Sequence, residues 1–219
     1  MDGNSKWANS QGFNKYYGHK KGVDTAKNTI QDVLNLGIKH LTLYAFSIEN
    51  WQRPKDEVQW LMKLLSLYLQ SEKNNFAKHG IKFKIIGSVH PLPPQLQIDI
   101  QKTIEFTKNN DKMNLYLAFS YGGRNEIIDA TKKIIQANVK ADEINTDLYK
   151  TFLYDSTMPD LDLIIRTGGQ KRISNFLLWH CAYSELYFIE KYWPDFTKTD
   201  LENAIAEFNK RIRTFGGRK

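Results

Sequence analysis

Apolar residues along this chain follow two spacings, one of three and four residues that is typical of helices and one of two that is typical of strands. The helical spacing predicts helices over 18–36, 54–78 and 199–213, around 96–104 and 127–135, and a polar helical piece near 146–154. Alternating or β-branched runs predict strands over 39–46, 81–86, 113–119, 161–165 and 186–188. This order is typical of an α/β fold with a mainly parallel central sheet and helices on both faces. No repeat or linker interrupts it, so residues 1–219 are predicted to form a single domain.

The predicted strand over 39–46 alternates, with Leu41, Leu43 and Ala45 expected on one face. It runs into the polar segment 47–54, Ser-Ile-Glu-Asn-Trp-Gln-Arg-Pro, which precedes a helix. In α/β sheets, ligands bind at the carboxyl ends of the strands. The segment is therefore a candidate binding loop.

The predicted strand over 161–165 runs into a second candidate loop, Arg-Thr-Gly-Gly-Gln-Lys-Arg-Ile-Ser over 166–174. Arginine matches phosphate oxygens two at a time, and glycine-rich loops expose backbone N–H groups to anions. The alternative is a solvated turn with surface arginines. The first eight residues, MDGNSKWA, are interpreted as a further loop of the same polar character, and the three loops together favour one shared anion site at the edge of the sheet.

The composition limits the class of protein. A hydrophobic content of 41% excludes a disordered chain, and no apolar run approaches the roughly 18 residues of a membrane span. A formal net charge of +7 would suit RNA or an anionic lipid surface. However, the lysines are scattered and no RNA-binding motif is present, so RNA binding is kept only as an alternative and no nucleic-acid partner is predicted. The single cysteine and the lack of a signal-like start predict a cytoplasmic protein.

Four motifs occur in order: MDGNSKWA at 1–8, GHKKG at 18–22, YAFSIENWQRP at 44–54 and RTGGQKRISNFLLW at 166–179. Together they resemble the motifs of cis-prenyltransferases, most closely of the bacterial undecaprenyl diphosphate synthases, or isoprenyl transferases. The resemblance implies that family's fold. It also implies an enzyme that adds isopentenyl diphosphate sequentially to an allylic diphosphate such as farnesyl diphosphate. The product would be a long-chain cis-polyprenyl diphosphate such as undecaprenyl diphosphate, for cell-wall lipid carrier synthesis.

An alternative within the resemblance is a weakly active or inactive subunit or scaffold of a prenyltransferase. Such partners typically lose the aspartate of MDGN or the arginine of RTGG, and this chain has both. The trans-prenyltransferases and terpene cyclases use Asp-Asp-x-x-Asp metal motifs, which are not present in this sequence. An active cis-prenyltransferase is the interpretation we prefer.

The resemblance also implies roles for individual residues. Asp2 would be catalytic and would bind Mg²⁺, with Glu185 as a second metal ligand. The allylic diphosphate would be held by Gly3, Asn4, Ser5, Lys6, Trp7, Lys15 and His19. Isopentenyl diphosphate would be held by Arg166, Arg172, Ile173 and Ser174. At Lys6 and Lys15 the family generally has arginine, and lysine keeps the charge but loses the bidentate fork.

The loop predicted to close over the substrates consists of Ser47, Ile48, Glu49, Asn50, Trp51 and Arg53. The family assigns removal of the C2 proton to Asn50, but a neutral amide oxygen is a very weak base. We therefore expect an oxygen of the released diphosphate to accept this proton while Asn50 orients it. Trp51 is either part of the core or a lid over the isoprenoid.

The remaining expectations concern assembly and product. The resemblance implies a homodimer that delivers its product to the membrane through a peripheral contact at the inner face. Chain length depends on which of the apolar helix residues face a tunnel, and the sequence leaves open whether these are Leu61, Leu65, Leu69, Ile100 or Ile104. In the family a short apolar strand precedes MDGN, so we expect that the first strand is missing here and that an upstream extension raises activity and stability.

Overall fold

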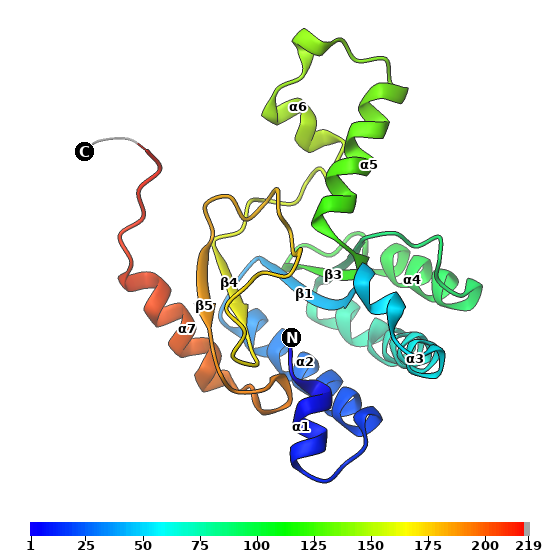
Figure 1. Cartoon of the computed structure of the whole chain (residues 1–219), viewed down its shortest axis with the longest axis vertical. Coiled ribbons are helices and arrows are strands. Elements are labelled where there is room, and N and C mark those ends of the chain that lie inside the picture. The colour runs from blue at the N-terminus through cyan, green and yellow to red at the C-terminus, as the bar shows by residue number, and fades with distance from the viewer. Residues whose placement is uncertain (217–219) are drawn as a thin grey trace. The chain divides into compact units, whose positions relative to one another are not determined.

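The computed structural model describes residues 1–216, which form two compact units (Figure 1). The first unit comprises Met1–Asp32 and the chain from Pro159 onward, and the second comprises Val33–Met158. The α/β prediction is confirmed: each unit contains parallel strands and helices. The strands belong to two hydrogen-bonded sheets, one in each unit.

The second unit is built on a three-stranded parallel sheet with the order β1-β3-β2. β3 lies in the middle and is buried along almost its whole length, which explains its continuous apolar sequence. The strands are β1 (His40–Ser47), β2 (Ile81–Ile86) and β3 (Met113–Tyr121). The helices of this unit are α3 (Lys55–His79), α4 (Pro94–Thr107), α5 (Gly123–Gln136) and α6 (Thr146–Thr151), with single 3-10 turns at Ile48–Gln52 and Ala141–Glu143.

The alternation predicted for β1 breaks near its end. Leu43 is buried as expected, but Ala45 is exposed and Phe46 is buried to 1% exposure. The pairing with β3 explains the change, because Tyr44 pairs with Ala118 while Phe46 pairs with Phe119. Ala45 is thus an extra residue on β1, and a β-bulge of this kind turns the following side chains to the other face.

The first unit contains a two-stranded parallel sheet of β4 (Leu163–Arg166) and β5 (Glu185–Phe188). Its helices are α1 (Asn4–Ser10), α2 (Lys15–Asn35, in this unit up to Asp32) and α7 (Lys198–Lys210), with a 3-10 turn at Trp193–Asp195. The interpretation of residues 1–8 as a loop was wrong in part, because the chain becomes helical at Asn4. No helix in residues 1–216 is long and apolar enough to cross a membrane.

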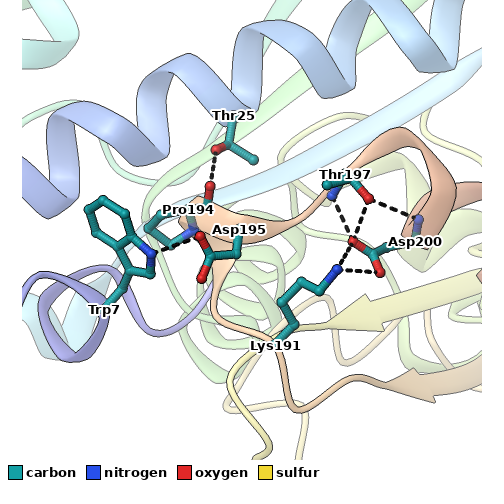
Figure 2. Close-up of polar contacts among 7 residues, drawn as sticks. All are labelled: Trp7, Thr25, Lys191, Pro194, Asp195, Thr197 and Asp200. Carbon is teal, nitrogen blue, oxygen red and sulfur yellow. Dashed lines mark hydrogen bonds and ion pairs between the residues drawn. The ribbon is translucent and has the colours of Figure 1, made fainter. Parts of the chain in front are cut away.

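The turn that follows β5 is fixed by both N-terminal helices. The indole N–H of Trp7 donates to Asp195 Oδ1 at 2.8 Å, and the hydroxyl of Thr25 donates to the carbonyl of Pro194 at 3.1 Å (Figure 2). The indole of Trp193 adds a bond to the carbonyl of Gly22 on α2 at 2.8 Å. This turn is therefore held by hydrogen bonds to both α1 and α2.

Asp200 organises the start of α7. Its carboxylate accepts from the backbone N–H and hydroxyl of Thr197, at 2.8 and 2.7 Å, and from Lys191 Nζ at 2.7 Å (Figure 2). The Thr197 hydroxyl oxygen accepts in turn from the backbone N–H of Asp200, which completes a capping box. The helix begins at Lys198, one residue before the predicted start at 199, and ends at Lys210, before the predicted end at 213.

Candidate active site

Arg166, the last residue of β4, connects two of the sequence motifs through its guanidinium group. Its Nη2 donates to Asp2 Oδ2 at 2.9 Å. Its Nη1 donates to Ser174 Oγ at 2.7 Å and to the carbonyl of Arg172. The Arg166 side chain is 14% exposed and that of Asp2 is 42% exposed, so the pair lies at the surface with the carboxylate open to solvent. The predicted metal ligand and the predicted phosphate loop are thus in direct contact.

The loop after β4 holds an unusual backbone. Gly168 and Gly169 have positive φ, and so do Ser174, Asn175 and Leu177, with φ of 48°, 62° and 43°. For residues with a side chain this conformation costs of order 1–3 kcal/mol each and persists only where the surroundings enforce it. Leu177 is fully buried, which anchors the end of the loop. Strain of this kind next to Arg166 is typical of a binding loop.

The glycines of the GHKKG motif explain how α1 and α2 pack. A Cβ atom added to Gly18 would lie 2.2 Å from the carbonyl oxygen of Asn4, and one added to Gly22 would lie 2.2 Å from Asn4 Oδ1. The two helices therefore touch at backbone distance. Ser5 Oγ and His19 Nε2 lie 3.4 Å apart as a result. Two glycines four residues apart in a predicted helix were the signal for this contact.

The other predicted residues of the first motif differ in their surroundings. Lys6 is exposed, and the ammonium group of Lys15 lies 5.3 Å from the ring centroid of Tyr16. Trp7 is buried, and its indole N–H is bonded to Asp195. Trp7 therefore packs as part of the core of this unit.

Glu185, the predicted second metal ligand, begins β5 and pairs with Leu163, whereas Arg166 pairs with Phe188. Three residues of strand correspond to roughly 10 Å, so Glu185 and Asp2 lie toward opposite ends of this small sheet. The carboxylate of Glu185 accepts instead from Arg211 Nη1 at 2.7 Å. Arg211 was not among the predicted site residues, and nothing in the sequence indicates this pairing.

The acidic groups that could hold Mg²⁺ are few. Across residues 1–216 no cluster of three or more histidine, cysteine, aspartate or glutamate side chains is present. Mg²⁺ commonly uses one or two carboxylates together with substrate phosphate oxygens and water. The half-exposed carboxylate of Asp2 fits such a site, in which the substrate supplies the remaining oxygen ligands.

The predicted closing loop belongs to the second unit. Ser47 ends β1, and Ile48 and Glu49 begin the 3-10 turn. The backbone N–H of Ser47 donates to Asn50 Oδ1 at 3.1 Å, so the amide oxygen of Asn50 caps its own turn. This bond occupies one of the two lone pairs of the amide oxygen.

Trp51 and Arg53 are also fixed within this unit. The indole N–H of Trp51 donates to Ser120 Oγ at 3.0 Å, and its ring packs edge-on against Phe46 with centroids 5.3 Å apart. Arg53 forms an ion pair with Glu57 at 3.2 Å. The loop is therefore ordered by contacts with its own strand and helix.

Comparisons with known proteins agree with the four motifs. Residues 1–216 match the family model of undecaprenyl diphosphate synthase. The isoprenyl transferase of Rickettsia sibirica is 52% identical over 218 residues, which cover 100% of this chain and 96% of the relative. That of Fusobacterium nucleatum is 46% identical over 222 residues, which cover 100% and 94%.

Two solved structures are also similar. Lavandulyl diphosphate synthase from Lavandula x intermedia, in complex with dimethylallyl diphosphate, matches with a TM-score of 0.95 and 36% identity over 99% of this chain and 95% of that chain. A probable undecaprenyl diphosphate synthase from Campylobacter jejuni matches with a TM-score of 0.82 and 37% identity, covering 90% and 93%. The chain therefore belongs to the undecaprenyl diphosphate synthase family of cis-prenyltransferases.

Proposed function

We propose that this protein is a Mg²⁺-dependent cis-prenyltransferase that adds isopentenyl diphosphate sequentially to an allylic diphosphate. Farnesyl diphosphate is the expected primer, and a long-chain product such as undecaprenyl diphosphate is the expected outcome. The observation that carries the proposal is the contact between the Asp2 carboxylate and Arg166 at the start of a strained, glycine-containing loop. A reaction between two diphosphates needs both kinds of group, a carboxylate for the metal and cations for the phosphates.

In each round, the C–O bond of the allylic diphosphate breaks, a C–C bond forms to the double bond of isopentenyl diphosphate, and one proton leaves. We assign the phosphates of isopentenyl diphosphate to Arg166, Arg172 and Ser174, with Ile173 beside them. The guanidinium of Arg166 has five N–H donors, and its contacts with Asp2, Ser174 and the Arg172 carbonyl leave donors for phosphate oxygens.

The allylic diphosphate is assigned to the first motif and to α2, namely to Gly3, Asn4, Ser5, Lys6, Lys15 and His19. Bound Mg²⁺ would neutralise the charge of the departing diphosphate, and Asp2 is the residue that would hold it. Asn50 would orient the diphosphate oxygen that takes the proton, because its own amide oxygen is a weak base and already caps a turn.

We further propose that the enzyme works as a homodimer in the cytoplasm and that it delivers its product at the inner face of the membrane for cell-wall lipid carrier synthesis. These assignments rest on family membership. Light scattering during gel filtration tests the dimer, and sedimentation with anionic vesicles tests the membrane contact.

A shorter product is the second candidate, because the lavandulyl diphosphate synthase matches with a TM-score of 0.95. The decisive experiment incubates the full chain with radiolabelled isopentenyl diphosphate and either farnesyl or dimethylallyl diphosphate, with Mg²⁺ or with EDTA. The dephosphorylated products are then separated by length. A long ladder that requires Mg²⁺ supports the proposal, a single short product identifies a short-chain synthase, and no incorporation with either primer identifies an inactive subunit.

A further inference from the structure

The main chain of Asp2 is tied to the residue that follows Arg166. The backbone N–H of Asp2 donates to Thr167 Oγ1 at 2.9 Å, and the same hydroxyl donates to the backbone carbonyl of Asp2 at 3.0 Å. Thr167 is 2% exposed. We propose that Thr167 is a positioning residue that sets the orientation of the Asp2 carboxylate. This proposal rests on the proposed function of Asp2.

Two further contacts fix the position of Asp2. The backbone N–H of Trp193 donates to the Asp2 carbonyl at 2.9 Å, and Trp193 belongs to the turn that α1 and α2 hold in place. Gly168 lies against Asp2 as well, since a Cβ atom added there would come within 3.3 Å of Asp2 Cβ. The main chain and Cβ of Asp2 are therefore held by Thr167 and Gly168, which follow β4, and by Trp193 in the turn after β5.

The hydroxyl of Thr167 and the guanidinium group of Arg166 hold different parts of Asp2. Arg166 holds the outer end of the Asp2 side chain, through the same carboxylate that is proposed to bind Mg²⁺. Thr167 holds the main chain from which that side chain projects, and its two bonds do not depend on the charge of the carboxylate. Reacting groups must be held to within about half an ångström for full activity. Thr167 thus keeps Asp2 in place while the partners of its carboxylate change.

The arrangement also links the two substrate sites. Arg166 and Thr167 are consecutive residues, one assigned to isopentenyl diphosphate and the other tied to the residue assigned to the metal. The residue assigned to isopentenyl diphosphate and the main chain of Asp2 are therefore attached to the same short piece of chain.

The test compares Thr167→Val, which keeps the shape and removes the hydroxyl, with Thr167→Ser, which keeps the hydroxyl. The matched control is Thr29→Val, which removes another buried threonine hydroxyl in the same unit, bonded to the carbonyl of Thr25 within α2 and neither to Asp2 nor to the turn after β5. We expect Thr167→Val to lower kcat at least tenfold with KM for both diphosphates within threefold of wild type. Thr167→Ser should recover most of kcat, and Thr29→Val should keep kcat within twofold. Hydrogen exchange of the peptide that contains Asp2 should accelerate in Thr167→Val alone.

Three results would overturn the proposal: wild-type kcat in a folded Thr167→Val, a serine variant as slow as the valine variant, or an equal loss of kcat in Thr29→Val. If Thr167→Val does not fold, Thr167→Ala carries the same comparison. An inactive wild-type chain would refute the proposed function instead. The exchange measurement would still decide whether Thr167 ties the main chain of Asp2, and an unchanged exchange rate in Thr167→Val would overturn the tie itself.

Discussion

A substitution of Arg172 is expected to weaken substrate binding while leaving the stability of the fold unchanged. Its carbonyl accepts from Arg166, while its guanidinium group is exposed. Arg172→Ala therefore keeps the contact that orders the loop and removes only the group assigned to isopentenyl diphosphate. We expect KM for isopentenyl diphosphate to rise and KM for the allylic primer to stay within about threefold, in steady-state assays with one substrate varied and the other saturating.

The size of the effect follows from the kind of contact. Hydrogen bonds to charged groups contribute about 1.5–3 kcal/mol, and solvent around an exposed side chain favours the lower part of this range. A loss of about 1.5–2 kcal/mol corresponds to a rise in KM of roughly 10- to 30-fold. The midpoint of thermal unfolding should change by less than about 2 °C, because exposed substitutions usually cost less than about 0.5 kcal/mol.

Lys171→Ala is the matched control, since it removes one positive charge from the adjacent exposed position of the same loop. A comparable rise in KM in both variants would show that the loop attracts the substrate through its overall charge and not through a specific contact of Arg172. Equal increases in KM for both substrates in Arg172→Ala would refute the assignment of this loop to isopentenyl diphosphate.

Three further predictions test other parts of the molecule. Asp2→Ala should lower kcat more than tenfold in the Mg²⁺-dependent assay with an unchanged circular dichroism spectrum, because its main-chain bonds remain; a retained kcat would exclude it from the mechanism. Trp51→Phe should lower the free energy of unfolding in urea by about 1 kcal/mol, because the buried hydroxyl of Ser120 loses its donor; unchanged stability would show that this bond contributes nothing. Burial alone would raise the pKa of Asp200, but hydrogen bonds, first of all that from Lys191, outweigh it and lower the pKa. The contribution of the carboxylate is therefore complete above the unfolded pKa of about 3.9 and is lost as the pH falls through the folded value. Asp200→Asn should melt earlier than wild type at pH 7, and the difference should narrow as the pH falls below about 3.9; a difference independent of pH would contradict this.

The long elements could be predicted from the sequence because their periodicity is strong. Each predicted strand and each long helix is present, and most boundaries agree within a few residues. The helix α1 was missed because its seven residues are too few to show a periodic pattern. The division of the strands between two sheets depends on which strands pair, which periodicity does not indicate.

Only those residues of the candidate site that lie in the sequence motifs could be predicted. The resemblance to the cis-prenyltransferases indicated Asp2, Arg166 and Ser174, and in the structure Arg166 contacts both of the other two; their roles remain predictions. Thr167 could not be selected, because its function comes from two bonds to a residue distant in sequence. The placement of Glu185 beside Arg211 is likewise a result of tertiary packing.

The irregular pairing of β1 and β3 has a consequence for insertions and deletions in this family. Beyond the extra Ala45, β3 carries an extra residue of its own, since Phe46 pairs with Phe119 and Ser47 with Tyr121. That residue, Ser120, has φ of 50° and receives the indole N–H of Trp51. The two insertions cancel, so β1 and β3 end at the paired residues Ser47 and Tyr121. The side chains that follow the insertions point to the opposite face from the one that regular alternation would give. Removal of Ala45 alone would leave β3 one residue too long. Removal of both would restore a regular sheet, but Ser47 and the predicted closing loop would then leave it from the opposite face. Positions 45 and 120 are thus expected to be gained or lost together.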